Sequence, residues 1–480
     1  MPSQACPFND TLFREGLQQL PQHWLRHFSP RSISLGQQQK TWRGLKGWGR
    51  TLFVIQRGRL LYAPLAPTGC MLRRTPILAW ALLETLERHP DLPDVSIPFN
   101  CRDQPLYWYP DGLQPQGGYE ISTTATTSDG KPALVFSYTT GHTFSDIPFP
   151  DYTFWGLPYA HIPPWERWLA EREGAPSSRW ENKIDKLLWV GTTGVGNGAA
   201  GSTSHRLRSR FARCAPAVFG NRLVHRRVDK RELFRLAWKC PPGECVMPQN
   251  WTTLEEQCKS RVILHFPGVS DWLDHFKHQL ACGSLNVFVT EEPRQRDRRR
   301  EAEVRPPLTP PRFSHFDWWS PLLRAGEHYV HVQVPRRRGR AYDHEICSAV
   351  RKTLARLDAD PEKARCIAER GQQLARSLTM RTVYEYIASV LRKAASVQQP
   401  ELVRDQIALH QRLDRALSGR NPPAGSERRL VTKRSLLRHV SNSTRPWIEK
   451  VFLPANGANT SLFMRSGTSA TPYPFTFHRR

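Results

Sequence analysis

The feature of this sequence that most constrains the fold is an alternation of short apolar runs with amphipathic stretches in its second half. The apolar runs predict buried strands at 187–190, 262–266, 285–289 and 329–334. Helical patterns follow three of these runs, at 205–213, 271–281 and 343–357. Strands that alternate with helices are joined by right-handed crossovers into a parallel sheet, so we expect such a sheet here. Ligands of such sheets bind beyond the carboxyl ends of the strands, where helix N-termini gather.

The first half predicts another α/β unit. Its expected elements are a strand–turn–strand over 51–62, a helix over 77–86, and strands over 95–99 and 133–137. A long amphipathic helical stretch covers 364–393, with interruptions expected near Gly371 and at Leu378-Thr379. These patterns divide the chain into a loosely attached lead-in (1–50), an α/β domain (51–178), a second α/β domain (179–358) with a mobile insertion (291–312), closing helices (359–395) and a disordered basic tail (396–480).

The chain is strongly basic, with 69 Lys and Arg residues against 43 Asp and Glu residues and a formal net charge of +26. This charge suggests an anionic partner such as nucleic acid, acidic lipid or a nucleotide phosphate; a solvated basic surface is the alternative. Residues 401–480 hold nine more basic than acidic residues, so much of the charge belongs to the tail. The apolar share of 39% excludes wholesale disorder. No apolar run reaches the roughly 18 residues of a membrane span, and the first residues lack the basic-then-apolar pattern of a secretory signal.

Several familiar chemical motifs are absent or have simpler explanations. The sequence has no P-loop, GxSxG or HExxH motif, and the Gly-rich stretch 191–201 lacks the lysine of a P-loop. Asp358-Ala359-Asp360 has the form of a metal-binding D-x-D motif, but it precedes Pro361 and a helix and is better explained as a helix cap. Cys240 and Cys245 could belong to a zinc site, although a turn is the better explanation. Ten cysteines in 480 residues are too few for a disulfide scaffold.

The best acidic candidate for catalysis is Asp103. It follows the 95–99 strand, lies beside Arg102 and belongs to a loop that also contains Pro105. A carboxylate at a strand end can accept a proton from an incoming hydroxyl group. A structural salt bridge between Arg102 and Asp103 is the alternative.

Two groups of basic residues could bind a diphosphate. The first is the run 205–210, and the second is the pair His275 and Lys277 on the helix after the Gly268 turn. Guanidinium groups and helix N-termini stabilise phosphate charge without a metal. Each group could also be a solvated helix face.

Six segments occur in a recognisable order: LPDVSIPFNCRDQP, DYTFWGLPYAHIPPWE, KLLWVGTTG with HRLRSRF, HFKHQLACGSL, HYVHVQV and ARCIAERGQQLARSLTMRTVYEY. Together they resemble glycosyltransferase family 90, the capsule-associated and protein O-glucosyltransferase-like enzymes, over about residues 50–395. The resemblance implies an α/β fold of the GT-B type, in which two Rossmann-like domains face each other across a cleft. It also implies an inverting transfer from a UDP-sugar to a hydroxyl of a glycan or protein, with no metal and no other cofactor.

The resemblance assigns a chemical role to the segment that follows the 95–99 strand. The family's Asn-x-Arg-Asp-x-Pro pattern matches Asn100, Arg102, Asp103 and Pro105, and its aspartate is the proposed general base. Asp103 thereby becomes the catalytic candidate, and Arg102 lies on the acceptor side. Asp151 and Trp155 are expected beside the cleft on that same side, because an aromatic face suits the C–H surface of a sugar.

On the donor side, the resemblance implies a set of residues from two segments: Gly191, Thr192, Thr193, Arg206 and Arg208 from the first, and Gly268, His275, Lys277 and Ser284 from the second. The chain departs from the family pattern where Val190 and His275 stand in place of the usual arginines. It also departs where Ser260-Arg261-Val262 replaces a Tyr-Lys-Tyr-type run. Each charge-assisted contact to a diphosphate is worth roughly 1.5–3 kcal/mol, so these departures would weaken the site unless Arg261 or the 205–210 run compensates. His275 would also make donor binding sensitive to pH.

The resemblance further pairs Cys258 with Cys282, which match two cysteines that are bonded in relatives; two buried thiols are the alternative. A bond would favour an oxidising lumen, and the resemblance itself implies the Golgi or the endoplasmic reticulum.

Three candidate functions follow from the sequence: a glycosyltransferase, an inactive family member that binds a nucleotide sugar or glycan, and a nucleic-acid-binding protein that uses its basic tail. The last ranks lowest because the tail lacks interleaved aromatic and basic residues.

Overall fold

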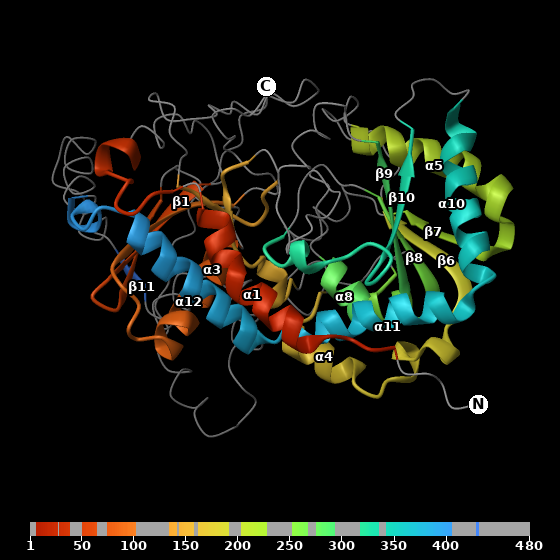
Figure 1. Ribbon diagram of the computed structural model, residues 1–480, viewed down its shortest axis with the longest axis horizontal. Coiled ribbons are helices and arrows are strands. Elements are labelled where there is room, and N and C mark those ends of the chain that lie inside the picture. Colours follow the sequence, from red (N-terminus) through yellow and green to blue (C-terminus); the bar gives the residue numbers. More distant parts are fainter. Residues whose placement is uncertain are drawn as a thin grey trace, which may run out of the picture.

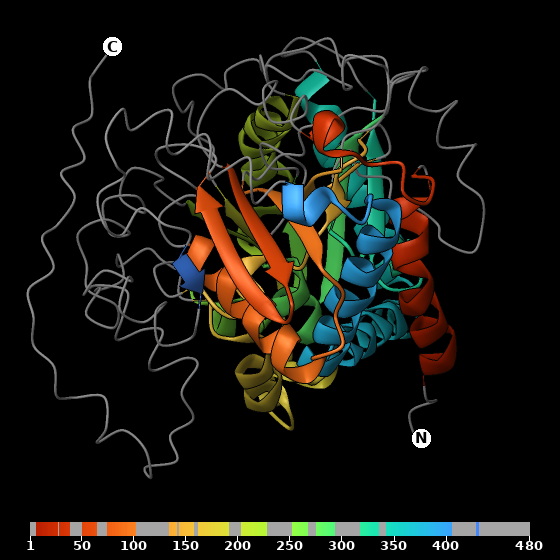
Figure 2. The ribbon, with the colours of Figure 1, turned by 90° about the vertical axis from the view of Figure 1, so that its left-hand side faces the viewer.

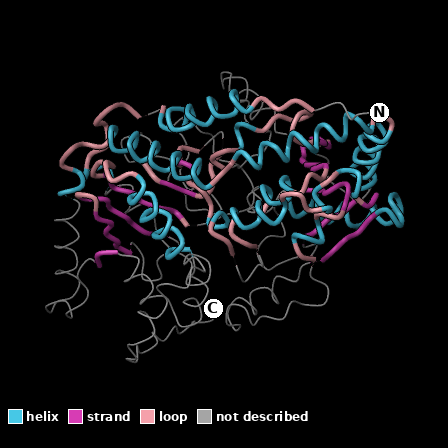
Figure 3. Tube along the Cα trace, turned by 90° about the horizontal axis from the view of Figure 1, so that it is seen from below, coloured by secondary structure: helices cyan, strands magenta, loops and turns pink. Residues whose placement is uncertain are grey.

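The chain folds around two β-sheets that stand at opposite ends of its long axis (Figure 1). The computed structural model describes residues 6–26, 28–38, 50–64, 74–101, 134–141, 144–157, 162–191, 203–227, 252–266, 275–292, 317–335, 342–405 and 429–431. Helices lie between and around the two groups of strands, as the view from below shows (Figure 3). The α/β class expected from the sequence is therefore confirmed.

The first sheet is mixed, with the order β11-β2-β1-β3-β4-β5. Its strands are β1 (Arg50–Gln56), β2 (Arg59–Pro64), β3 (Val95–Asn100), β4 (Phe136–Ser137), β5 (Ile147–Pro148) and β11 (Arg429–Val431). The hairpin β1–β2 turns at Arg57 and Gly58, which both have positive φ angles of 49° and 67°. This is the two-residue turn whose twist matches that of the flanking strands. β3 pairs antiparallel with β1 and parallel with β4.

The second sheet is entirely parallel, with the order β10-β9-β8-β6-β7. Its strands are β6 (Ile184–Gly191), β7 (Leu223–Arg227), β8 (Ser260–His265), β9 (Leu285–Glu291) and β10 (Val330–Val334). All four runs predicted in this region are strands, and β7 is an addition at the edge. The order is that of a doubly wound sheet, because the chain adds strands first to one side of β6 and then to the other.

Alternate side chains of the second sheet face two different helix layers. Val287 and Val289 pack with helices α5 (Thr203–Phe219) and α10 (Asp343–Asp358), whereas Phe288 packs with α8 (Phe276–Ala281). This follows from the two-residue period of a strand. In Figure 1, α11 (Pro361–Ser377) runs below these strands, and it contacts α8.

The first sheet is covered by helices from both ends of the chain. These are α1 (Asp10–Leu25), α3 (Arg74–Arg88) and α12 (Met380–Val397), with α4 (Trp165–Arg172) leading toward the second sheet. Figure 2 shows α1 and α12 next to each other beside the strands of the hairpin, and the two helices are in contact. One continuous buried cluster includes side chains of the first sheet, of these helices and of α8. The shorter elements are η1 (Tyr152–Phe154), η3 (Pro176–Ser178), η4 (Trp180–Asn182), η5 (Gly220–Arg222), α7 (Leu254–Gln257) and η6 (Ser320–Leu322).

The expectation of a loosely attached lead-in is wrong for α1. Asn9 caps this helix by accepting a hydrogen bond from the Leu12 amide at 2.9 Å, and Leu20 is completely buried. A disulfide between Cys6 and Cys366 also joins the segment to α11. The sequence suggested otherwise because α1 is rich in Gln, although its apolar residues recur at helical spacing.

The break in the long C-terminal helical stretch falls at one of the two expected places. α11 ends at Ser377, and Thr379 caps α12 by accepting from the Thr382 amide at 3.2 Å. Gly371 does not interrupt α11. An added Cβ at this position would lie 2.4 Å from the His328 carbonyl oxygen, so the glycine allows a close approach between two segments.

Part of the predicted tail is ordered, because β11 pairs with β2 at the edge of the first sheet. The remainder of the tail after residue 405 lies outside the described residues, and so does most of the expected insertion at 291–312, from residue 293 onward. Among the described helices, none combines the length and apolar character needed to cross a membrane.

We expect Leu20→Ala to lower the free energy of unfolding by about 2–5 kcal/mol, because it leaves a cavity in a closed core. Leu12→Ala on the same helix is the matched control, since Leu12 is 40% exposed, and its effect should stay within about 0.5 kcal/mol. Urea unfolding followed by tryptophan fluorescence measures both. Equal effects of the two substitutions would contradict the burial of α1.

Candidate functional site

The sheet order indicates where a ligand would bind, which is beyond the carboxyl ends of β6 and β8. β6 lies between β7 and β8, so the direction of winding reverses there, and ligands of doubly wound sheets bind at this reversal. β6 ends at Gly191 and β8 ends at His265. An added Cβ at Gly191 would lie 2.9 Å from Nε1 of Trp189, so a larger residue would require a shift. Gly191, predicted to bind the donor, is thus placed at the reversal.

Several predicted site residues lie outside the described residues, and their roles stay predictions. They are Arg102 and Asp103 on the acceptor side, and Thr192, Thr193 and Gly268 on the donor side. Arg206 belongs to α5, but its side chain is not described.

The end of β8 is held by a buried histidine. Nε2 of His265 lies 2.8 Å from Oδ1 of Asn286, and its ring stacks on Phe288 with centroids 4.7 Å apart. Burial lowers the pKa of His265 to about 3, so the ring is neutral at physiological pH. His275 occupies the N-cap position of α8, where its side chain makes no capping hydrogen bond.

The arginines of α5 are partly engaged inside the protein. Nη2 of Arg208 donates to the Phe266 carbonyl at 3.2 Å, immediately after β8. Arg210 is buried, with Nη1 3.5 Å from Oε1 of Glu291 and Nε 3.4 Å from Oδ1 of Asp343. The run 205–210 is therefore not simply a solvated face, and part of its charge is balanced by carboxylates.

Lys277 and Asp151 form a buried ion pair that joins the two predicted sides of the site. Nζ of Lys277 lies 2.9 Å from Oδ2 of Asp151, and each side chain is only 1% exposed. Nζ also contacts the Thr153 hydroxyl and lies 4.1 Å from the ring centroid of Phe154. The Asp151 carboxylate accepts a further hydrogen bond from the Thr153 amide at 2.7 Å and so caps η1. The pair links α8 to η1 across 126 residues of sequence.

Two other predicted contact residues have internal partners. Trp155 is buried and donates from Nε1 to the Tyr384 hydroxyl at 3.2 Å. Ser284 is completely buried, donates to the Ser260 carbonyl at 2.8 Å, and lies 3.1 Å from Nζ of Lys183. These contacts favour structural roles for both side chains over direct contact with a sugar or phosphate.

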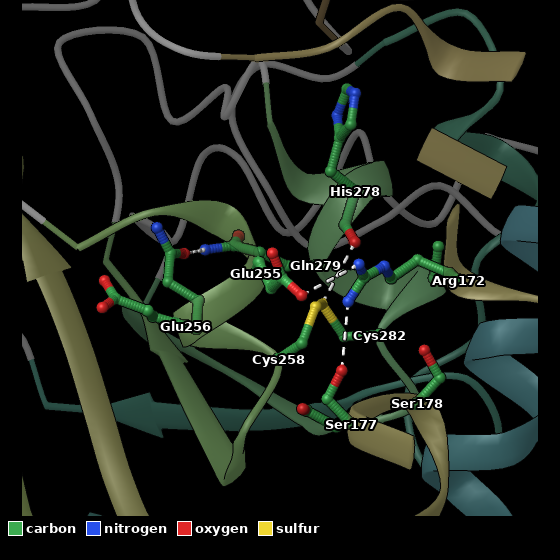
Figure 4. Close-up of a disulfide and its surroundings, with 12 residues drawn as sticks. Arg172, Ser177, Ser178, Glu255, Glu256, Cys258, His278, Gln279 and Cys282 are labelled. Atoms are coloured by element: carbon green, nitrogen blue, oxygen red, sulfur yellow. Dashed lines mark hydrogen bonds and ion pairs between the residues drawn. A yellow bond between two sulfur atoms is a disulfide. The ribbon is translucent and has the colours of Figure 1, made fainter. Parts of the chain in front are cut away.

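A disulfide between Cys258 and Cys282 fixes the carboxyl end of α8 to the segment before β8 (Figure 4). Nζ of Lys183 donates to the backbone carbonyls of both cysteines, at 2.6 and 2.7 Å. Burial lowers the pKa of Lys183 to about 7, with a smaller contribution from the positive charge of Arg172. Beside the disulfide, Nη1 of Arg172 donates to Oγ of Ser177 at 3.0 Å.

The cysteines are used more fully than their number suggested. Disulfides join Cys6 to Cys366, Cys214 to Cys347 and Cys258 to Cys282, and Cys101 is also disulfide-bonded. The expectation that ten cysteines are too few for a framework of this kind is therefore wrong. Cys240 and Cys245 lie outside the described residues.

The D-x-D motif has the structural role preferred from the sequence. Asp360 caps α11 by accepting from the Lys363 amide at 3.1 Å. Asp358 accepts two hydrogen bonds from Arg222, at 2.7 and 2.9 Å. Both carboxylates therefore have protein partners, which does not fit the metal-binding alternative.

Sequence reasoning missed several buried cations, among them Arg74 and Lys183. Arg74 begins α3 and donates to the Cys101 carbonyl, immediately after β3. Lys183 precedes β6 and supports the disulfide. The only local signal was a basic residue next to a strongly apolar element, which is common on protein surfaces.

The sequence matches a known family and known proteins over much of its length. Residues 50–295 match the family described as glycosyl transferase family 90. An O-glucosyltransferase rumi homolog of Aedes aegypti is 26% identical over 328 residues, which is 66% of this chain and 65% of that protein. An O-glucosyltransferase rumi homolog of Anopheles gambiae is 25% identical over 326 residues, with the same shares. The chain thus matches about 65% of the length of these relatives.

We expect Lys277→Met to lower the free energy of unfolding by about 3–5 kcal/mol, because it leaves the Asp151 carboxylate buried without its cation. The double variant with Asp151→Asn should lose less than the sum of the two single effects. Arg392→Met is the control, since its pair with Asp91 is exposed and should contribute little to stability. Strictly additive single effects in urea unfolding would contradict a direct ion pair.

The lowered pKa of His265 predicts acid sensitivity. The unfolded chain binds a proton near pH 6.5, whereas the folded chain binds it only near pH 3, so stability falls as the pH decreases through this window. Between pH 6.5 and pH 4.5, this ring should cost the parent protein about 2–3 kcal/mol of unfolding free energy. His265→Gln should lack this loss. The exposed His344→Gln is the control and should leave the pH profile of urea unfolding unchanged. An unaltered profile for His265→Gln would show that this ring is not responsible.

Proposed function

Because the chain belongs to glycosyl transferase family 90, we propose that it is an inverting glycosyltransferase that moves a sugar from a UDP-sugar to a hydroxyl of a glycan or protein. The observation that carries this proposal is the family match over 50–295, which includes β3, the segment after it, and β6 to β9. Two β-sheets with helices packed on them, at opposite ends of the molecule, support the GT-B arrangement that such enzymes use.

In the proposed reaction, Asp103 is the general base. Its carboxylate takes the proton of the acceptor hydroxyl while that oxygen forms a bond to the anomeric carbon of the sugar. The bond between this carbon and the diphosphate oxygen breaks, and UDP leaves with the bonding electrons from the opposite face. The configuration at the anomeric carbon is therefore inverted, and Asp103 later returns the proton to water. The carboxylate acts without a metal.

The donor is proposed to bind at the reversal between β6 and β8. Gly191, Thr192 and Thr193 would surround the phosphates on one side, and the Gly268 turn with His275 on the other. The half-buried Arg208 and the start of α5, with Arg206, would supply positive charge beside them. Lys277 and Ser284 would support the shape of this crevice from inside, because both side chains are buried.

The acceptor and the sugar are proposed from the relatives. Both are named O-glucosyltransferases, so UDP-glucose is the first donor to test and a hydroxyl of a protein is the first acceptor. The acceptor side would lie near β3, which precedes Arg102 and Asp103, and near η1, which Asp151 precedes and Trp155 follows.

An oxidising lumen, such as that of the endoplasmic reticulum or the Golgi, is the proposed compartment. The disulfides between Cys6 and Cys366, Cys214 and Cys347, and Cys258 and Cys282 support it, because such bonds persist in oxidising environments and are rare in the cytosol.

A family member that binds nucleotide sugar without turnover is the second candidate. Val190 and His275 favour it, since both stand where guanidinium groups are usual, and His275 carries charge only when it is protonated. Calorimetric binding of UDP together with no UDP release from any donor would support this candidate over the enzyme.

We expect Asp103→Asn to reduce UDP release by at least about 10²-fold, because the amide cannot accept the hydroxyl proton. The assay supplies a panel of UDP-sugars, starting with UDP-glucose, and measures UDP. Asp91→Asn is the matched control, since it makes the same change at an exposed surface pair. If Asp103→Asn turns over donor as fast as the parent protein, Asp103 is not the base.

A further inference from the structure

The start of α1 carries an Asn-x-Thr triplet, Asn9-Asp10-Thr11. Such a triplet is the acceptor signal for N-linked glycosylation in secreted proteins, provided that its middle residue is not proline. Three further triplets of this kind begin at Asn250, Asn442 and Asn459, and these asparagines lie outside the described residues. Asn9 is therefore the acceptor candidate whose surroundings the structure describes.

The side-chain amide of Asn9 uses one of its two polar atoms within the protein. Oδ1 accepts a hydrogen bond from the Leu12 amide at 2.9 Å and so caps α1. Among the described residues, Nδ2 has no hydrogen-bond partner, and Asn9 is exposed. A glycan is attached at Nδ2 and leaves the lone pairs of Oδ1 in place. The helix cap and the modification therefore use different atoms and are compatible.

The residue before Asn9 holds the chain in a defined direction at this point. The ring of Phe8 packs on that of Phe13, with centroids 5.9 Å apart, and on that of His328, with centroids 6.2 Å apart. A contact between the residue before the cap and the fourth residue of the helix fixes the angle at which the chain enters the helix. Phe8 is thus held against the core while Asn9 stays at the surface.

The segment before α1 is also attached to α11. Cys6 is bonded to Cys366, and Nε of Arg370 donates to the Pro7 carbonyl at 3.1 Å. Figure 1 shows this segment running along α11 up to the start of α1. A glycan on Nδ2 of Asn9 would therefore stand at a fixed place on the surface, beside the start of α1.

The need for a helix cap explains asparagine at position 9 but not a hydroxyl group at position 11. Thr11 is exposed at the second position of α1, where a β-branched residue has no advantage for the helix. Within the described part of the chain, its hydroxyl makes no hydrogen bond. The glycosylation signal, in contrast, requires a hydroxyl residue at this place. The two residues together therefore favour an acceptor site over a cap alone.

We propose that Asn9 is a site of N-linked glycosylation. This inference rests on the proposed function in an oxidising lumen, because the transfer takes place there. The donor is an oligosaccharide carried on a lipid diphosphate. Nδ2 forms a bond to C1 of its first sugar, and the bond between this carbon and the diphosphate oxygen breaks. The lipid diphosphate leaves with the bonding electrons, and Nδ2 gives one proton to a base of the transferring enzyme.

The test expresses the full chain behind a cleavable secretory signal in eukaryotic cells and maps its peptides by mass spectrometry. We expect the peptide that contains Asn9 to carry a glycan, and peptide N-glycosidase to release this glycan and leave aspartate at the position. Asn9→Asp and Thr11→Ala should each abolish the modification, whereas Thr11→Ser should retain it. A parent protein whose Asn9 peptide is found only without a glycan would overturn the inference.

The variants are chosen so that the loss of the glycan is separated from the loss of the helix cap. Asn9→Asp keeps an oxygen atom that caps α1, because aspartate is as good a cap as asparagine. Thr11→Ala keeps Asn9 itself and changes an exposed side chain. After enzymatic removal of all glycans, both variants should therefore unfold in urea at the same midpoint as the parent protein. A glycan that persists at Asn9 in Thr11→Ala would contradict recognition of this triplet.

The same preparations distinguish this inference from the proposed function. If Cys6 and Cys366 are bonded but Asn9 is unmodified, the chain has reached the lumen and Asn9 is not an acceptor. If Asn9 is glycosylated but no UDP is released from any UDP-sugar, the enzyme function fails and this inference stands. The glycan is read by mass, so its detection does not depend on activity.

Discussion

The buried pair of Lys277 and Asp151 is the ionic contact that joins the part of the chain after the first sheet to the helix that packs on the second sheet. Each charge is almost completely removed from water, and neither can be tolerated there without the other. The pair therefore couples η1, which follows the first sheet, to α8, which packs on the second. Lys277 was predicted to bind the donor and Asp151 was predicted to lie beside the acceptor. In the structure, these two side chains contact each other instead.

α8 can serve as the connecting element because it is fixed along its whole length. It has only six residues, and a helix this short is not stable by itself. Lys277 is held by the ion pair, the His278 carbonyl accepts from Nε1 of Trp168 at 3.0 Å, and Cys282 is bonded to Cys258. The position of α8, the helix after β8, is consequently set by tertiary contacts at three successive places.

The net charge of +26 is a poor guide to the location of the site. Arg74 and Arg210 are buried and use their guanidinium groups to hold carbonyl or carboxylate oxygens. Lys183 does the same around the disulfide. Basic side chains in this protein thus hold the backbone at strand ends, besides any that bind an anionic substrate. A sequence does not distinguish these two uses because both need the same side chains.

The sequence by itself determined β6, β8, β9 and β10 of the second sheet, the helix break at Leu378-Thr379 and the capping role of Asp360, whereas the edge strand β7 was not predicted. Each depends on residues within a few positions of one another, where periodicity and capping chemistry act directly. Only the tertiary structure decided that α1 belongs to the core, that Cys6 bonds to Cys366 across 360 residues, and that Lys277 faces Asp151. A local pattern states which face of an element is buried, whereas the partner of that face depends on the order of the strands and the path of the chain between them.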